Sequence, residues 1–162
     1  MTDVTIYATM KTLHLLALIV WVGGMFFTLA CLRPSLGVLE GPMRLRLMHA
    51  VFGRFFTIVD AAIGLLLLTG LGMLWFAWRA ANGANTPFSM PLSWHLMIVL
   101  GLVMMGLFGH IRASLFKRLG AAVQAQDAAT GAALLGRIRK LVTVNFALGV
   151  LIVVAMKLGA AG

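Results

Sequence analysis

The chain has 162 residues, of which 62% are hydrophobic and only 10% carry a charge. Soluble domains are about half apolar and about a quarter charged, so this composition excludes an ordinary soluble protein and predicts an integral membrane protein. The net charge is +9. The basic residues lie mostly between apolar segments, so we interpret them as determinants of membrane topology and exclude nucleic acid as a partner. The single cysteine, Cys31, excludes an internal disulfide and a Cys-rich metal site.

Four apolar segments are long enough to cross a bilayer as helices, which takes about 20 residues each. In chain order they cover residues 12–32, 55–78, 92–116 and 138–158. Because the connections between them are short, neighbouring segments should run antiparallel. The sequence therefore predicts an all-α polytopic membrane protein with one domain, an antiparallel four-helix transmembrane bundle.

Basic residues are distributed unequally between the two ends of this predicted bundle. The connections at one end, residues 33–54 and 112–140, contain ten Lys and Arg residues. The other end contains three, Lys11, Arg79 and Lys157. Cytoplasmic connections of membrane proteins are enriched in Lys and Arg. We therefore expect a multi-pass protein of a bacterial-type inner membrane with both termini outside the cytoplasm.

Two histidines are predicted to lie at matching depth near the outer face. His14 begins the first segment and His95 begins the third. Ionisable groups inside a bilayer are costly and usually functional, and neutral imidazole is a good ligand for haem iron and for copper. We expect His14 and His95 to bind a metal centre, either b-type haem or copper. Three further residues would contact it: Lys11 through a haem propionate, Trp21 on the helical stripe of His14, and Met97 through its thioether.

A second group of polar residues is predicted near the inner face. Asp60, His110 and Asn145 come from three different segments at similar depth, and Arg54 lies within two turns of Asp60. Such a cluster could relay protons, bind a cation, or simply hold the helices together through polar contacts. A second haem would need an inner histidine on the first segment, which has none, so His49 would have to replace it.

Several motifs resemble those of the copper resistance protein D (CopD) family. They are KTLHLLA at residues 11–17, WVGGMFF at 21–27, LRPSL at 32–36, FGRFF at 52–56 and GLFGH at 106–110. The resemblance covers nearly the whole chain, as the short, four-span form of that family, and it implies membrane residence and copper handling. Longer members have eight spans and are associated with copper uptake. Because this chain has four, the resemblance leaves room for a homo-oligomer or a redox partner protein.

The chain is more distantly similar to the HemJ-type protoporphyrinogen oxidases, which bind b-type haem. The shared feature is the Lys-x-x-His spacing of Lys11 and His14. The first span of those enzymes continues with a Pro-Arg-Leu stretch and a nearby histidine, whereas this chain has LRP at residues 32–34. That departure weakens the oxidase interpretation and leaves haem binding open.

Three functions therefore remain open, all within the lipid bilayer. The first is a CopD-like protein that binds b-type haem or copper between its helices, in copper handling or membrane electron transfer. The second is a HemJ-like enzyme that oxidises protoporphyrinogen or a quinol with the help of haem. The third is a structural or assembly subunit of a membrane complex. The sequence is compatible both with an enzyme and with a binding protein.

Overall fold

The computed structural model describes residues 2–158, and every regular element in that range is helical. The chain forms four helical rods, and each is long and apolar enough to cross a membrane. The first rod consists of α1 (Asp3–Phe27), η1 (Thr28–Leu32), α2 (Arg33–Ser35) and η2 (Leu36–Val38), and the second is α3 (Gly41–Gly83). The third rod consists of α4 (Leu92–His110), η3 (Ile111–Leu115) and α5 (Phe116–Gln124), and the fourth is α6 (Ala128–Leu158).

The predicted fold class, an all-α bundle of four apolar helices, is confirmed. Each predicted segment lies inside one rod, but the rods are longer than the segments. The clearest case is α3, which begins at Gly41 with Pro42 in its first turn and runs for 43 residues. Proline is tolerated there because the first backbone N–H groups of a helix have no intrahelical partner. The basic stretch after it contains no helix breaker, so the helix continues straight into the apolar segment.

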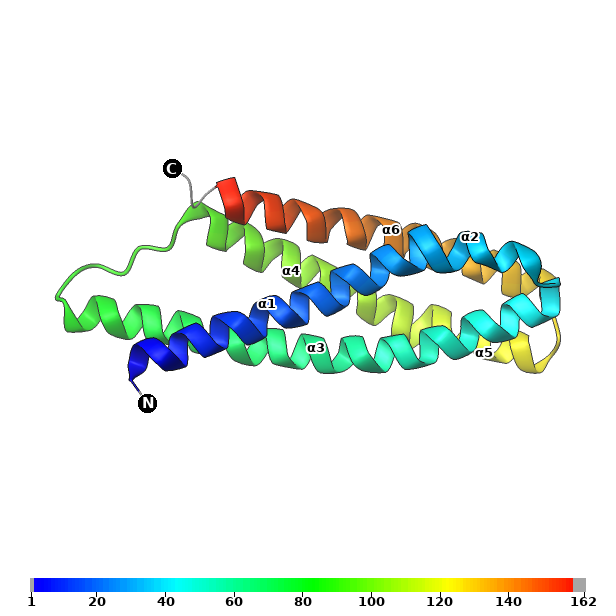
Figure 1. Ribbon diagram of the computed structural model, residues 1–162, viewed down its shortest axis with the longest axis horizontal. Helices are drawn as coiled ribbons and strands as arrows, with labels where there is room; N and C mark the ends of the chain where they lie inside the picture. The colour runs from blue at the N-terminus through cyan, green and yellow to red at the C-terminus, as the bar shows by residue number, and fades with distance from the viewer. Residues whose placement is uncertain (1, 159–162) are drawn as a thin grey trace.

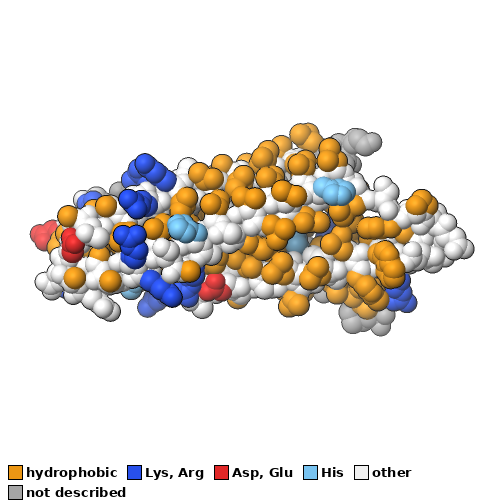
Figure 2. Space-filling view, turned by 180° about the vertical axis from the view of Figure 1, so that it is seen from behind, with side chains coloured by type: hydrophobic (Ala, Val, Ile, Leu, Met, Phe, Trp, Pro, Cys, Tyr) orange, Lys and Arg blue, Asp and Glu red, His pale blue; other side chains and the backbone are white. Residues whose placement is uncertain are grey.

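The four rods lie side by side and alternate in direction (Figure 1). The turn from η2 into α3 and the turn from α5 into α6 lie together at one end, which we call the basic end. The start of α1, the connection 84–91 and the last turn of α6 lie at the other, which we call the terminal end. Figure 2 shows most visible Lys and Arg side chains gathered at the basic end, with apolar side chains along the middle.

The rods are packed as two pairs, α1 on α3 and α4 on α6, with α5 closing against α3 and α6. The buried centre is aromatic. The rings of Trp21 and Phe108 form a T-shaped pair with their centroids 6.0 Å apart. Phe56 and Phe108 form a second T-shaped pair with their centroids 5.5 Å apart. Large apolar side chains such as Leu68 and Leu71 are instead exposed, by 73% and 65%. Such exposure would promote aggregation in water, whereas in a bilayer these side chains contact lipid.

The first rod widens before it reaches the basic end. In η1 the backbone N–H of Arg33 bonds to the carbonyl of Thr28, five residues earlier, as in a π-helix. Pro34 follows immediately, and proline has no N–H to offer the carbonyl four residues before it. The widened turn therefore lies beside the carbonyl of Ala30, to which Pro34 offers no donor.

The last rod begins with a capped helix. The side chain of Asp127 accepts a hydrogen bond from the backbone N–H of Thr130 at 3.0 Å. Hydrogen bonds from Thr130 lower the pKa of the Asp127 carboxyl, because they favour its ionised form. This cap separates α5 from α6 at the basic end and sets where the fourth rod starts.

Candidate functional site

His14 is held by a hydroxyl of the neighbouring helix. Its Nδ1 lies 2.9 Å from Thr69 Oγ1 on α3. The hydroxyl of Thr69 donates its proton to the carbonyl of Leu65 at 2.6 Å. A hydroxyl has one proton to give, so toward His14 it can only accept, and Nδ1 must be the donor. The neutral imidazole therefore keeps the lone pair on Nε2, which is the form that binds a metal.

Small residues on α3 let the first helix come close at this point. A methyl group on Gly70 would lie 3.4 Å from Cε1 of His14, and one on Gly72 would lie 2.8 Å from Sδ of Met10. Met10 precedes His14 by one helical turn, so the two side chains occupy the same face of α1. The contact between α1 and α3 thus holds one imidazole, a borderline donor, and one thioether, a soft donor, and copper accepts both.

His95 lies in the first turn of α4, and it is exposed. Its Nδ1 is 3.2 Å from the carbonyl oxygen of Pro91. A carbonyl oxygen only accepts, so here too Nδ1 carries the proton and Nε2 keeps its lone pair. Both histidines at the terminal end therefore present the same ring nitrogen, although they are positioned by different elements.

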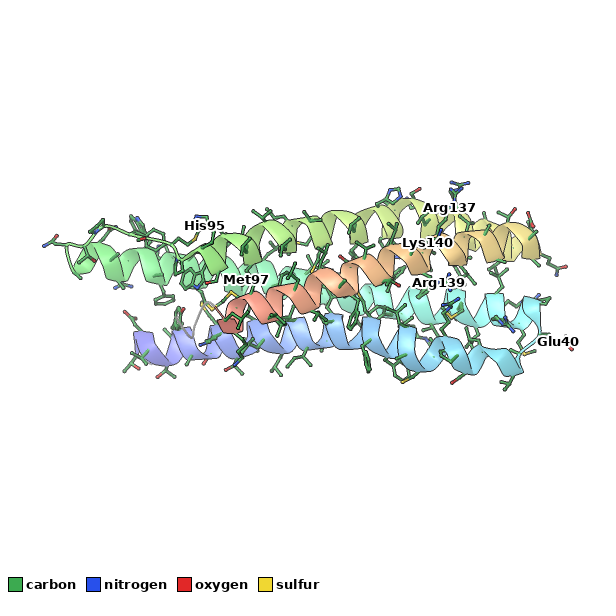
Figure 3. All side chains as sticks on the ribbon, turned by 90° about the horizontal axis from the view of Figure 1, so that it is seen from above. Glu40, His95, Met97, Arg137, Arg139 and Lys140 are labelled. Atoms are coloured by element: carbon green, nitrogen blue, oxygen red, sulfur yellow. The ribbon has the colours of Figure 1, made fainter. Side chains whose placement is uncertain are left out.

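The structure does not bring His14 and His95 into contact. His14 is bonded to α3, whereas His95 is bonded to the residue just before its own helix. Figure 3 shows His95 on the side of α4 that faces away from α1. Ligation of one centre by both histidines stays a prediction.

The three residues predicted to assist a cofactor have different surroundings. Lys11 is exposed on α1. Trp21 is 2% exposed and belongs to the aromatic centre, where it packs against Phe108. Met97 is half-buried against the core and points to a different side of α4 from His95 (Figure 3). Of these three, Lys11 is the one whose side chain can reach a group bound at the surface of the terminal end.

The predicted inner cluster is spread over different faces of the bundle. Asp60 Oδ2 lies 3.3 Å from Arg112 Nε, and both side chains are partly exposed. Arg54 and His110 are exposed as well. Asn145 is 2% exposed in the bundle centre, where its Oδ1 has no hydrogen-bond partner. The structure therefore pairs Asp60 with Arg112, which sequence analysis had counted among the basic residues at the end of the third segment and not in the inner cluster.

His49 has a packing role in this arrangement. Its ring stacks on Phe116 with the centroids 4.8 Å apart and the planes 12° from parallel. Its Nε2 lies 3.1 Å from where a methyl group on Gly120 would be. These contacts join α3 to α5 at the basic end, far along the bundle from His14.

No three His, Cys, Asp or Glu side chains gather in the way a metal site would among residues 2–158. Methionine sulfur is a further soft donor, and Met10 lies one turn from His14 where α1 contacts α3.

The family model for copper resistance protein D matches residues 49–158. The search of curated proteins and the search of solved structures gave no match. The matched range contains the last three rods nearly complete, with Thr69 and His95, while His14 precedes it. Because the match covers more than half of the chain, it shows the family that the motifs resemble, and two of those motifs, FGRFF and GLFGH, lie inside it. The chain belongs to the copper resistance protein D family and is a multi-pass membrane protein.

Proposed function

We propose that this protein handles copper in the membrane and that His14 binds Cu(I) through Nε2 at the terminal end. The observation that carries the proposal is the hydrogen-bond relay from His14 through Thr69 to the Leu65 carbonyl. A metal-binding histidine typically donates its other ring N–H to a fixed oxygen, which sets the tautomer and the ring orientation. Family membership supports copper as the metal.

Met10 supplies a thioether as the second ligand. Cu(I) favours soft donors, and the pair of imidazole and thioether discriminates against Mg²⁺ and Ca²⁺, which prefer oxygen. His95 offers a further imidazole at the same end, and its exposure suits passing copper to or from His14. Copper is the cargo in this proposal, so the chain need not be an enzyme.

Copper binding is tested by anaerobic titration of the detergent-purified protein against a chromophoric Cu(I) chelator. We expect His14→Ala to lower the affinity by about 100-fold or more, since losing a ligand should cost at least as much as losing its supporting hydrogen bond. Met10→Leu should lower it less. The matched control is His110→Ala, which removes an exposed histidine at the inner part of α4 and should bind copper like the wild type.

The same sample distinguishes the alternatives. Copper affinity that is unchanged in His14→Ala would contradict the proposed site. A red protein whose Soret band disappears in His14→Ala or His95→Ala would identify b-type haem and favour electron transfer or a HemJ-like oxidase. A protein that binds neither copper nor haem, after both are supplied, would leave the role of an assembly subunit.

We also propose that the basic end lies in the cytoplasm, in an inner membrane, and that the copper site faces outward. The unequal charge of the two ends supports this orientation. Two exposed alanines provide a matched pair of labelling positions: Ala84 in the connection at the terminal end and Ala125 in the turn at the basic end.

In a Cys31→Ser background, Ala84→Cys should react with a membrane-impermeant maleimide in intact cells. Ala125→Cys should react only after the membrane is permeabilised. The reverse pattern would place the basic end outside, and it would move His14 to the cytoplasmic face.

A further inference from the structure

A pocket of about 480 Å³ opens at the basic end between the first rod, α3 and α6. Its volume lies within the range of small-molecule sites, which is about 300–1,000 Å³. The widened turn η1 and the Pro34 that follows it form one wall. Arginines and apolar side chains from the first rod, α3 and α6 line the rest of it.

Three arginines line this pocket, and none of them is in an ion pair within residues 2–158. The ion pairs in that range are Arg79 with Asp3 and Arg112 with Asp60. Arg33 and Arg139 line the same pocket from the first rod and from α6, so their positive charges share one space. Like charges held together near the surface of a membrane protein, with no carboxylate between them, make a site for an anion.

The arginines come from three different rods and are directed into the same space. Arg44 is fixed to the η2 turn, because its Nε donates to the Leu36 carbonyl and its Nη2 to the Leu39 carbonyl, each at 3.1 Å. These bonds use two of the five guanidinium N–H donors, so three stay available. Figure 3 shows Arg139 pointing from α6 toward the first and second rods, whereas Arg137 points the opposite way.

The remaining lining is largely apolar. Leu29, Met48, Phe52, Leu135 and Val142 contribute carbon surface to the pocket. A small hydrated anion gains nothing from such a surface, since burying it there costs hydration. An anion that carries hydrocarbon chains uses both parts of the pocket, with its charge on the arginines and its chains on the apolar side chains.

We propose that this pocket binds one anionic phospholipid by its phosphodiester headgroup. Basic pockets between transmembrane helices at the level of the headgroups are known to hold such lipids. Arg33, Arg44 and Arg139 bind the phosphate, and the carbon surface between η1 and α6 holds the upper part of an acyl chain. The bound lipid neutralises the repulsion between arginines of different rods and thereby joins the first rod to α6.

The test is native mass spectrometry of the full chain in an uncharged detergent, titrated with dioleoyl phosphatidylglycerol and separately with dioleoyl phosphatidylcholine. We expect one tightly bound phosphatidylglycerol and no comparable phosphatidylcholine. The double variant Arg33→Gln/Arg139→Gln should bind phosphatidylglycerol about 25-fold more weakly, from about fivefold for each arginine near an anionic headgroup. The matched control Arg118→Gln/Arg137→Gln loses the same net charge at the same end but lies outside the pocket, and it should bind like the wild type.

The outcomes separate a specific pocket from general attraction. Equal weakening in the two double variants would overturn the proposal in favour of a diffuse basic surface. Displacement of the lipid by millimolar inorganic phosphate would show a site for a free anion and would also overturn it. In phosphatidylcholine, Arg33→Gln/Arg139→Gln should melt at or above the wild-type temperature, because it removes like charges without removing a lipid contact. That result shows that loss of lipid binding is not loss of folding. These results do not depend on copper binding at the terminal end.

Discussion

Replacing Thr69 with valine should weaken Cu(I) binding by about 10- to 100-fold, the usual effect of removing the oxygen that orients a metal-binding histidine. Valine has nearly the shape of threonine but cannot accept the proton of His14 Nδ1, which now lies 2.9 Å from the hydroxyl oxygen. Without that acceptor the imidazole can rotate and place its proton on Nε2, the nitrogen that must be unprotonated to bind copper.

Two variants make the measurement specific. Thr69→Ser restores a hydroxyl at the same position and should recover most of the affinity. Thr57→Val removes a hydroxyl on the same helix that donates only to the Gly53 carbonyl at 3.1 Å, so it should bind copper like the wild type. Affinities come from the chelator titration, and a thermal melt of each variant shows that it is folded. Thr69→Val with wild-type affinity would show that the hydroxyl does not position the ligand.

The neighbouring glycines of the first rod should respond to the same substitution with opposite signs. Gly24 faces α3, where a methyl group would overlap the ring of Phe55. Gly23 has no atom within 4 Å of the methyl position. Gly24→Ala should therefore reduce the stability of the bundle by about 1–3 kcal/mol, the usual range for overpacking, because the ring of Phe55 has to leave its place against α1. Gly23→Ala should be neutral or slightly stabilising, because alanine is the better helix former.

The difference is measured by equilibrium unfolding in mixed micelles of mild detergent and sodium dodecyl sulfate. Both variants carry the same chemical change at adjacent positions of one helix, so the effect of helix propensity cancels in the comparison. Equal stability of the two would mean that α1 and α3 do not pack at Gly24 as the structure shows. A loss of stability in Gly23→Ala alone would indicate a contact on the face that the structure leaves open, such as a second copy of the chain.

The fold class could be predicted from the sequence because the bilayer imposes local requirements. Each crossing needs about 20 apolar residues, and each must satisfy its backbone hydrogen bonds within itself as a helix. The four apolar segments meet both requirements with no knowledge of their neighbours. The family could be predicted for a similar reason, since motifs such as FGRFF and GLFGH are contiguous in the chain, and the CopD match includes both.

The start of α3 could also be predicted from the sequence, because Pro42 is favoured in the first turn of a helix and the basic residues after it continue into the apolar segment. Arg and Leu are both good helix formers, so only a breaker or a cap ends such a run. The turn that separates α5 from α6 lies in the connection expected between the third and fourth segments, and Asp127 sets its exact place by capping α6.

The position of a residue along an apolar segment predicts its depth in the membrane, so the sequence alone gives an expected depth for every histidine and for Asp60. Which way each side chain faces was decided only by the tertiary structure, which bonds His14 to Thr69 and Asp60 to Arg112 and leaves His95 exposed. In a soluble helix the apolar stripe would have shown the buried face. Here the surface that meets lipid is as apolar as the surface that meets another helix, so the hydrophobic pattern does not show which face of a helix is buried. Only the packing of small residues against large ones decides that face.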